Sequence, residues 1–451
     1  MEIQKSATII MVPFYLDNPG REEYLDNKGP WEVIPMDIQR GYLYTHIHKV
    51  LQSSVNQSER TDNHSFLIYS LKKGSILEKV ANSVKCMSHV NQKWTFRILN
   101  EVATLLSPKL IVCPDTEVGM LMLPVQLLSE ASPISHADLM TFNYFIQKAK
   151  EGSAPRLQNT DDMVENKSYT IPLLVRDLLQ SIIGGYHLFN ENRYHLFTYV
   201  QIRQSDLLQM DDDASDNFIR ICKNQTADYQ PAENDRENTI TPLFNNIYVG
   251  SSVEGSAIMM LSKGTSFDDN YLTDAVEGRF LWIYILAFMQ RISLIAIHRG
   301  LSDKQLFGSN GNSLSLTELR EESEKIIRMK VNTYFSDVSD YSQHNTFYQF
   351  CRKRLGVNRL FDELDDKMTQ LDKLLSQKSD KVRESNQLWI AIVVGIMAAL
   401  SAANDLTDLM AKIFSLDVDS PVTIVASYVI LFGMVAMGFW AIWKFHRQST
   451  A

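Results

Sequence analysis

The sequence predicts an α+β cytosolic domain followed by a long stalk helix and a two-helix transmembrane hairpin. Three observations lead to this expectation. Residues 1–270 mix short strand-like runs with amphipathic helical ones, whereas helical periodicity dominates from residue 271 onward. Two apolar runs, Leu388–Ala403 and Val422–Trp443, then follow a large polar body. The second run has about 22 uncharged residues, enough to cross a bilayer core of about 30 Å.

Composition narrows the function classes. The chain has 451 residues, which is enough for two or three domains with a buried core. Its net charge of −9 argues against direct nucleic-acid binding through a broad basic surface. The four cysteines, Cys86, Cys113, Cys222 and Cys351, have no paired spacing, which favours a reducing cytosol. Pro13 interrupts the first apolar run, so the N-terminus is expected to be a strand rather than a signal peptide.

In the first 270 residues, strands are expected where β-branched and aromatic residues cluster between turn residues. These strands are Thr8–Leu16, Ser65–Leu71, Lys109–Val112, Gly119–Val125 and His195–Arg203, with a hairpin of Asn246–Gly250 and Ala257–Leu261. Helices are expected at His136–Glu151, where Ser135 is a plausible N-cap, and at Ile171–Ile183. The polar stretches Asp211–Asp213 and Asn224–Glu237 are expected to be mobile.

Two helices are expected after residue 271. Phe280–Met289 is apolar all round, but Arg279, Gln290 and Arg291 bracket it. About ten apolar residues are too few for a membrane span, so a buried helix is favoured over a third span. Leu316–Phe335 forms the next helix.

A stalk helix is predicted from Asn345 to Asn386. A single apolar stripe runs along it, formed by Leu360, Leu364, Met368, Leu371 and Leu375. Charges of both signs occupy the other faces, as on a solvated helix. No proline lies between Leu355 and Leu400, so the stalk helix is expected to continue into the first span. One helix through both segments would have about 45 residues and a length of roughly 68 Å.

Basic residues set the topology of the hairpin. They precede the first span and follow the second: Lys378, Lys381, Arg383, Lys444, His446 and Arg447. The loop between the spans holds one basic residue, Lys412. The positive-inside bias therefore places both termini in the cytosol.

These elements give a division into six parts. They are a cytosolic α/β sensor domain (1–270), a helical bundle with the stalk helix (271–386), a first, pore-lining transmembrane helix (387–411), an outer loop (412–421), a second transmembrane helix (422–443) and a cytosolic tail (444–451).

Polar residues in the first span suggest a pore. Met397, Ser401, Asn404 and Asp408 are spaced to share one helix face. Continued toward the cytosol, the face gains Val394 (or Val393), Ile390 and Asn386. Several copies around an axis would turn this stripe inward and away from lipid. Its apolar middle would then gate by dewetting, and its outer ring of amide and carboxylate oxygens would attract a hydrated cation.

A simpler interpretation stays open for the acidic residues. Asn404, Asp405 and Asp408 can instead lie past the membrane edge, in the loop. Asp417 and Asp419 are either ordinary solvated charges or, with Asp405, an acidic outer mouth that raises the local cation concentration. No nucleophile–base signature stands out, so no catalytic residues are predicted and the chain is not expected to be an enzyme.

The order of these elements resembles the CorA family of divalent-cation channels, most specifically over residues 345–447. The resemblance implies a homopentamer, lipid-embedded, whose first spans line the pore. It also implies transient contact of a hydrated divalent cation, such as magnesium, at the outer mouth, where the helix-face argument places Asn404 and Asp408. The family carries Gly-Met-Asn at the outer end of the first span. This chain has Ala402-Ala403-Asn404-Asp405 there, with Asn404 at the place of the motif asparagine.

A divergent branch without Gly-Met-Asn is a better match. Those CorA-like proteins are associated with type III CRISPR systems and act as membrane effectors. This resemblance implies a channel in the bacterial inner membrane, opened in antiviral defence by a nucleotide messenger such as a conjugate of S-adenosylmethionine and AMP. It implies no covalent cofactor and assigns no ligand-binding residues. A constitutive transporter of magnesium, cobalt or zinc is the first alternative. A non-conducting, membrane-tethered binding protein or enzyme is the second.

Overall fold

The structure is a computed structural model. It describes residues 2–17, 25–26, 29–33, 42–47, 66–75, 84–89, 92–100, 106–128, 134–155, 157–159, 170–203, 210–271, 276, 278–303, 316–414, 425, 429 and 432–433. Two compact units are distinguished, Met1–Met368 and Thr369–Ala451.

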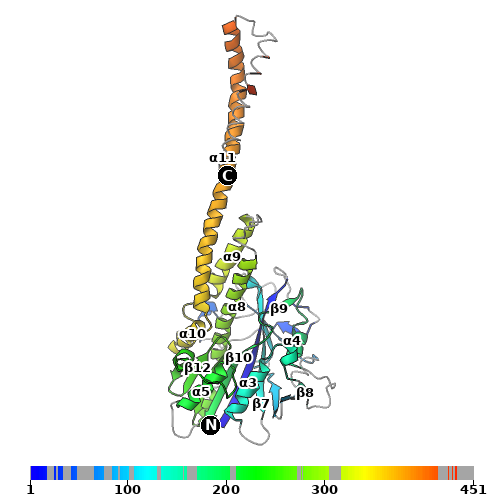
Figure 1. Ribbon diagram of the computed structural model, residues 1–451, viewed down its shortest axis with the longest axis vertical. Coiled ribbons are helices and arrows are strands. Elements are labelled where there is room, and N and C mark those ends of the chain that lie inside the picture. Colours follow the sequence, from blue (N-terminus) through cyan, green and yellow to red (C-terminus); the bar gives the residue numbers. More distant parts are fainter. Residues whose placement is uncertain are drawn as a thin grey trace. The chain divides into compact units, whose positions relative to one another are not determined.

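The described residues form a mixed α+β structure (Figure 1). The strands are β1 (Glu2–Leu16), β2 (Trp31–Val33), β3 (Leu67–Leu71), β4 (Val84–His89), β5 (Gln92–Ile98), β6 (Lys109–Cys113), β7 (Val118–Leu128), β8 (Leu157–Asn159), β9 (Tyr186–Leu188), β10 (His195–Arg203), β11 (Ile240–Phe244), β12 (Ile247–Ser251) and β13 (Gly255–Ser262). The helices are α3 (His136–Ile146), α4 (Ile171–Leu179), α5 (Asp212–Cys222), α6 (Asp235–Thr239), α7 (Ser266–Tyr271), α8 (Leu281–Asp303), α9 (Leu316–Thr333), α10 (Ser342–Arg354) and α11 (Val357–Phe414), with 3₁₀ helices η2 (Pro114–Thr116) and η3 (Glu151–Ser153).

All the described strands belong to one sheet in the first unit. Its main path runs β11-β12-β13-β10-β1-β7-β5-β4-β8. β10 and β13 are parallel, and the other pairs are antiparallel. β1 is the central strand, since it pairs with β7, β9 and β10. Its short partner β9 leads the chain back to β10, and this reversal forms part of the site described below.

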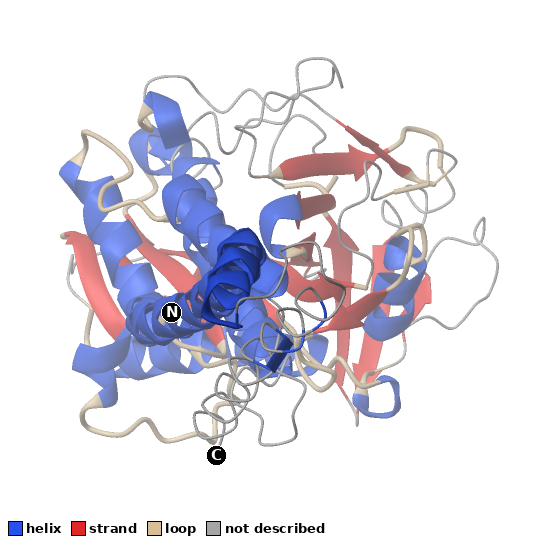
Figure 2. Ribbon diagram, turned by 90° about the horizontal axis from the view of Figure 1, so that it is seen from above, coloured by secondary structure: helices blue, strands red, loops and turns tan. Residues whose placement is uncertain are grey.

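β1 buries both of its faces, and the alternation of its side chains divides the core. Ile9 and Met11 belong to a cluster that includes α8, whereas Ile10, Val12 and Phe14 belong to one that includes α4. Successive residues of a strand point to opposite faces, so helices must cover the sheet on both sides. Figure 2 shows strands lying between helices in this unit.

α8 is the buried helix that the sequence predicts, although it is longer than the predicted Phe280–Met289. Among the described residues, one helix is long and apolar enough to cross a membrane, Gly278–Leu301, with a mean hydropathy of 1.9. The protein itself buries 83% of that window. Gln290 is fully buried and donates to the Tyr348 hydroxyl of α10 at 2.7 Å. These contacts are those of a core helix.

Several predicted elements are confirmed. The structure has strands at each predicted position, and β12 and β13 form the predicted antiparallel hairpin. α3 begins at His136, and the Ser135 hydroxyl accepts from the Asp138 amide at 3.1 Å, as an N-cap does. The predicted ends of α3 and α4 lie four to five residues too far along the chain, since these helices end at Ile146 and Leu179.

The predicted stalk is divided by a turn, and the expectation of one helix from Asn345 is wrong. α10 ends at Arg354 and α11 begins at Val357, with Gly356 at φ 72° between them. That left-handed conformation suits glycine and ends a helix. Beyond the turn the predicted continuity holds, because α11 is one helix of 58 residues, roughly 87 Å long.

The described residues cover the hairpin only in part. The backbone of α11 includes all of the predicted first span, 387–411. The predicted second span, 422–443, lies outside the described residues apart from four positions, and so do most of the loop 412–421 and all of the tail 444–451.

Candidate functional site

The predicted pore-lining residues all fall within α11. They are Asn386, Ile390, Val394, Met397, Ser401, Asn404 and Asp408. Steps of three or four residues place these positions along one face of a helix. Asp405 also lies in α11, whereas Asp417 and Asp419 lie outside the described residues.

Large apolar side chains of α11 are exposed in the single chain. Trp389 and Ile390 are each 63% exposed and Val394 is 55% exposed. Three residues of the predicted second span are also helical and exposed: Val425, Val429 and Phe432. Such an arrangement is typical of a surface that contacts lipid or another protein.

The first unit contains a second candidate site, a cavity of about 310 Å³ beside the central strand. Five segments that are distant in sequence form its wall. They are the end of β1 (Pro13, Tyr15), the residue after α3 (Gln147), the β9–β10 connection and the start of β10 (Phe189, Asn190, Arg193, Tyr194, His195), the β12–β13 turn (Val253, Glu254) and α8 (Phe288, Arg291, Ile292, Ile295). Its volume lies at the lower end of the range for small-molecule sites, about 300–1,000 Å³.

Local hydrogen bonds fix the β9–β10 connection. The Phe189 amide donates to the Pro13 carbonyl at 3.1 Å. The Asn190 side-chain oxygen accepts from the amides of Asn192 and Arg193, at 2.8 and 3.2 Å. An asparagine that bonds to the backbone two and three residues on stabilises a turn. The connection therefore holds Phe189 and Arg193 at the cavity with a defined backbone.

Aromatic rings form one part of the cavity wall. Phe189 stacks on Tyr15 with ring centroids 3.8 Å apart and planes 10° apart. The guanidinium of Arg299 lies 4.7 Å from the Tyr15 ring centroid. Also in the lining, His195 stacks on Phe288 with ring centroids 4.4 Å apart. Flat rings of this kind favour a planar ligand group.

α8 supplies the remaining wall through one helical face. Phe288, Arg291, Ile292 and Ile295 follow the i, i+3, i+4, i+7 pattern. Arg291 is the charged member, and burial lowers the pKa of its guanidinium. Its Nη1 donates to the carbonyl of Leu355, in the turn between α10 and α11. Arg291 thus belongs to the cavity and also contacts the turn from which α11 starts.

His195 begins a buried polar chain at the cavity wall. Its Nε2 bonds with the Tyr284 hydroxyl, which donates to Ser256 Oγ at 2.8 Å. Ser256 is in turn bonded to Ser251 Oγ at 2.7 Å. Burial and the nearby Arg291 charge lower the pKa of His195 to about 3. The imidazole is therefore neutral at pH 7, and its pKa is far from the value that suits acid–base catalysis at that pH.

The charges of the lining favour an anion. The lining holds two arginines, Arg193 and Arg291, and one carboxylate, Glu254, although the net charge of the chain is −9. Arg193 and Glu254 are exposed, so the cavity opens to solvent on their side. The geometry suits the binding of an anionic ligand.

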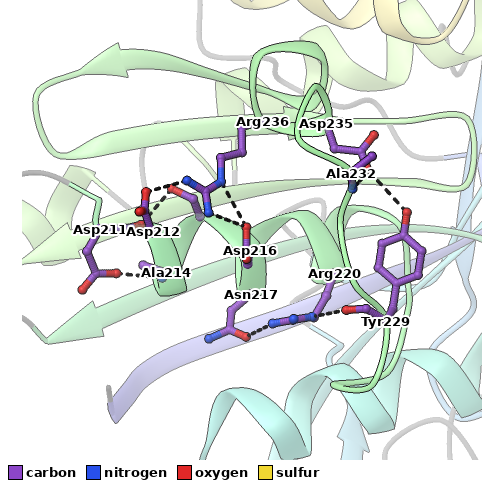
Figure 3. A network of polar contacts seen from close by, with 11 residues as sticks. Asp211, Asp212, Ala214, Asp216, Asn217, Arg220, Tyr229, Ala232, Asp235 and Arg236 are labelled. Atoms are coloured by element: carbon purple, nitrogen blue, oxygen red, sulfur yellow. Dashed lines mark hydrogen bonds and ion pairs between the residues drawn. The ribbon is translucent and has the colours of Figure 1, made fainter.

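A polar network nearby has a structural role (Figure 3). Arg236 pairs with Asp212 at 2.5 Å and with Asp216 at 3.0 Å, and Arg220 donates to the Tyr229 carbonyl at 2.7 Å. These contacts join α5 to α6 and to the segment before it. Residues 211–213 and 224–237, which are expected from the sequence to be mobile, carry ordered contacts in the structure: Asp211 caps α5 and Asp235 pairs with Lys223 at 2.8 Å. The expectation of mobility stays a prediction.

Neither helix α5 nor the cavity was predicted from the sequence. The signal for the cavity was weak: Arg291 stood out only as the end of an apolar run, and neither Asn190 nor Arg193 was singled out in the sequence. Within the part of the chain that the structure describes, no group of three or more His, Cys, Asp or Glu side chains could hold a metal ion. No protein-family model, curated protein or solved structure matches this chain.

Proposed function

We propose that the protein is a ligand-gated, homo-oligomeric cation channel of CorA-like architecture, with α11 lining the pore. The observation that carries this proposal is the continuity of α11 over 58 residues, from Val357 to Phe414. One helix joins the first unit to the predicted first span without a break. A displacement at its start can therefore be transmitted along it to the predicted pore.

The exposed apolar residues of α11 support a membrane and oligomer setting. Ile390 and Val394 lie on the predicted pore face, and Trp389 lies beside it. In one isolated copy they would meet water, which is unfavourable for side chains of this size. Identical neighbours around an axis can cover the pore face, and lipid can cover the outward one.

The predicted outer mouth follows from the same face. Asn404 and Asp408 lie one turn apart near the end of α11. Repeated around an axis, they would form rings of amide and carboxylate oxygens that hold a hydrated divalent cation, such as magnesium, transiently. We place this channel in the bacterial inner membrane, as a type III CRISPR effector opened by a nucleotide messenger.

Assembly is the most direct test of this architecture. The intact protein in detergent is expected to form a symmetric homo-oligomer, and we expect a pentamer. Native mass spectrometry measures the number of copies. Ile390→Asn with Val394→Asn, which makes the predicted interface polar, should shift the distribution toward smaller species. The exposed pair Glu363→Gln with Asp366→Asn is the matched control. A wild-type protein that is monomeric throughout would remove the pore proposal.

A further inference from the structure

The cavity in the first unit is the strongest unassigned feature of the molecule. We propose that it is the regulatory ligand site, that it binds the ring and phosphate of a nucleotide, and that Arg291 transmits its occupancy to the turn before α11. This deepens the proposed function, and only the step from the turn to ion flux rests on it.

The aromatic wall accounts for the ring. Phe189 is half-buried and already stacked on Tyr15, so its position is fixed before a ligand arrives. A planar base that continues this stack gains contact area with little loss of side-chain freedom. Every base can stack on an aromatic ring, so this wall selects for a planar ring but does not distinguish one base from another.

The arginines account for the anionic group. Guanidinium groups bind phosphate oxygens through paired N–H donors, and a partly desolvated guanidinium binds them more strongly than an exposed one. Arg291 is partly buried, and Arg193 is exposed at the same cavity. Glu254 on the rim disfavours a ligand with negative charge on all sides. The lining therefore fits a nucleotide, with its charge confined to one end.

Gln147 provides an independent indication of a ligand. This residue is 1% exposed and lines the cavity. Its Nε2 donates to the carbonyl of Asn224 at 3.0 Å, but its Oε1 has no hydrogen-bond partner among the described residues. A buried acceptor without a partner is unfavourable, and a ligand hydroxyl or amino group would satisfy it.

The coupling runs through a single short connection. Arg291 lines the cavity and donates to the Leu355 carbonyl, and its Nη1 lies within 3.4 Å of where a Cβ on Gly356 would be. Gly356 is the left-handed residue between α10 and α11. A phosphate that binds Arg291 competes with the Leu355 carbonyl for its donors. The turn at Gly356 is then free to change its conformation. Because α11 begins at Val357, the next residue, such a change acts directly on the start of α11.

Calorimetry on the full-length protein in detergent tests the site. The probes are AMP, adenosine, inorganic phosphate and the S-adenosylmethionine–AMP conjugate. AMP or the conjugate should bind more tightly than adenosine or phosphate alone. Phe189→Ala should weaken that binding roughly tenfold through lost stacking, and Phe189→Trp should restore it. Arg193→Ala should weaken the phosphate-bearing probes and leave adenosine unchanged.

Arg320→Ala is the matched control, since it removes an exposed arginine of α9 that is not part of the cavity lining. It should bind like wild type. If no probe binds, the ligand class is wrong. If a probe binds equally well to wild type, Phe189→Ala and Arg193→Ala, the cavity is not the site.

Hydrogen exchange tests the coupling. A saturating nucleotide should change the exchange rate of amides at the turn, among them those of Leu355, Gly356 and Leu360, which donate to the carbonyls of Cys351, Lys353 and Gly356. In Arg291→Lys, which keeps a charge but loses the paired donors, the same saturation should leave these rates unchanged. Turn amides that do not respond in wild-type protein would overturn the coupling.

These measurements need no ion flux, so the two proposals fail separately. A protein that binds nucleotide at the cavity but never conducts would overturn the channel proposal alone. A protein that opens with nucleotide, yet ignores Phe189→Ala and Arg193→Ala, would overturn the cavity site alone.

Discussion

Met397→Ser is expected to make the protein conduct cations without its ligand. Met397 continues the α11 face of Ile390 and Val394, the apolar middle of the predicted pore. A narrow apolar constriction seals because water leaves it, and a ring of hydroxyl groups would keep it wet. Lowering the closed-state barrier by about 1.4 kcal/mol raises flux about tenfold, so a rise of at least that size is expected.

Flux from liposomes into an ion-sensitive dye, in the absence of any nucleotide, measures this leak. Met397→Leu is the matched control, because it keeps an apolar side chain of similar volume and should stay closed. A Met397→Ser protein that is as tight as wild type would show that this face of α11 does not form the gate.

Asp408→Asn is expected to reduce selectivity for cations over anions. In a pentamer the predicted mouth would carry five carboxylates. At roughly 10 Å from the axis, each contributes about 0.4 kcal/mol to a monovalent cation in water, so five contribute about 2 kcal/mol before salt screening. A difference of about 2 kcal/mol corresponds to a factor of about 30, and screening reduces it, so selectivity should fall by at least about tenfold at low salt. Little loss of stability is expected because the position is predicted to lie near water.

Reversal potentials across planar bilayers under a salt gradient measure this selectivity. Asp366→Asn, an exposed carboxylate of α11 within the first unit, is the control and should leave the potential unchanged. The effect should shrink at high ionic strength, as a surface charge effect does. An unchanged potential in Asp408→Asn would instead support the simpler interpretation that this residue is an ordinary loop charge.

Seven strand positions could be predicted because each one depends on local residues, whereas β2, β4, β5, β8, β9 and β11 were not predicted from the sequence. His195–Arg203 and the hairpin of β12 and β13 carry apolar runs bounded by turn residues, which suffice to locate a strand. The order of strands could not be predicted. β1 pairs with β7, β9 and β10 across more than 100 residues, and β10 lies parallel to β13, and no local pattern specifies such partners.

Helix boundaries depended on single residues. Gly356 stands inside a strongly helical pattern, where one glycine is often tolerated, so the break between α10 and α11 was missed. Helix α5 was missed because its first turn is acidic. In the structure, Asp211 caps that turn by accepting from the Ala214 amide at 2.7 Å.

The two candidate sites differed in how well they could be predicted from the sequence. The α11 face could be found from the sequence, because one helical period relates all of its residues. Periodicity alone could not say what covers that face. The cavity could not be found, because Tyr15, Gln147, Arg193 and Arg291 come together only through the sheet and the packing of α8.

Ligand-dependent ion flux through the wild-type protein tests the central claim most directly. Full-length protein is reconstituted in liposomes, and cation flux is recorded before and after the S-adenosylmethionine–AMP conjugate or cyclic oligoadenylates are added to the side that carries the first unit. We predict little flux at first and rapid cation flux after one of these nucleotides is added. Constant flux that responds to magnesium but not to nucleotide would indicate a constitutive transporter, and oligomeric protein that never conducts would contradict the channel itself.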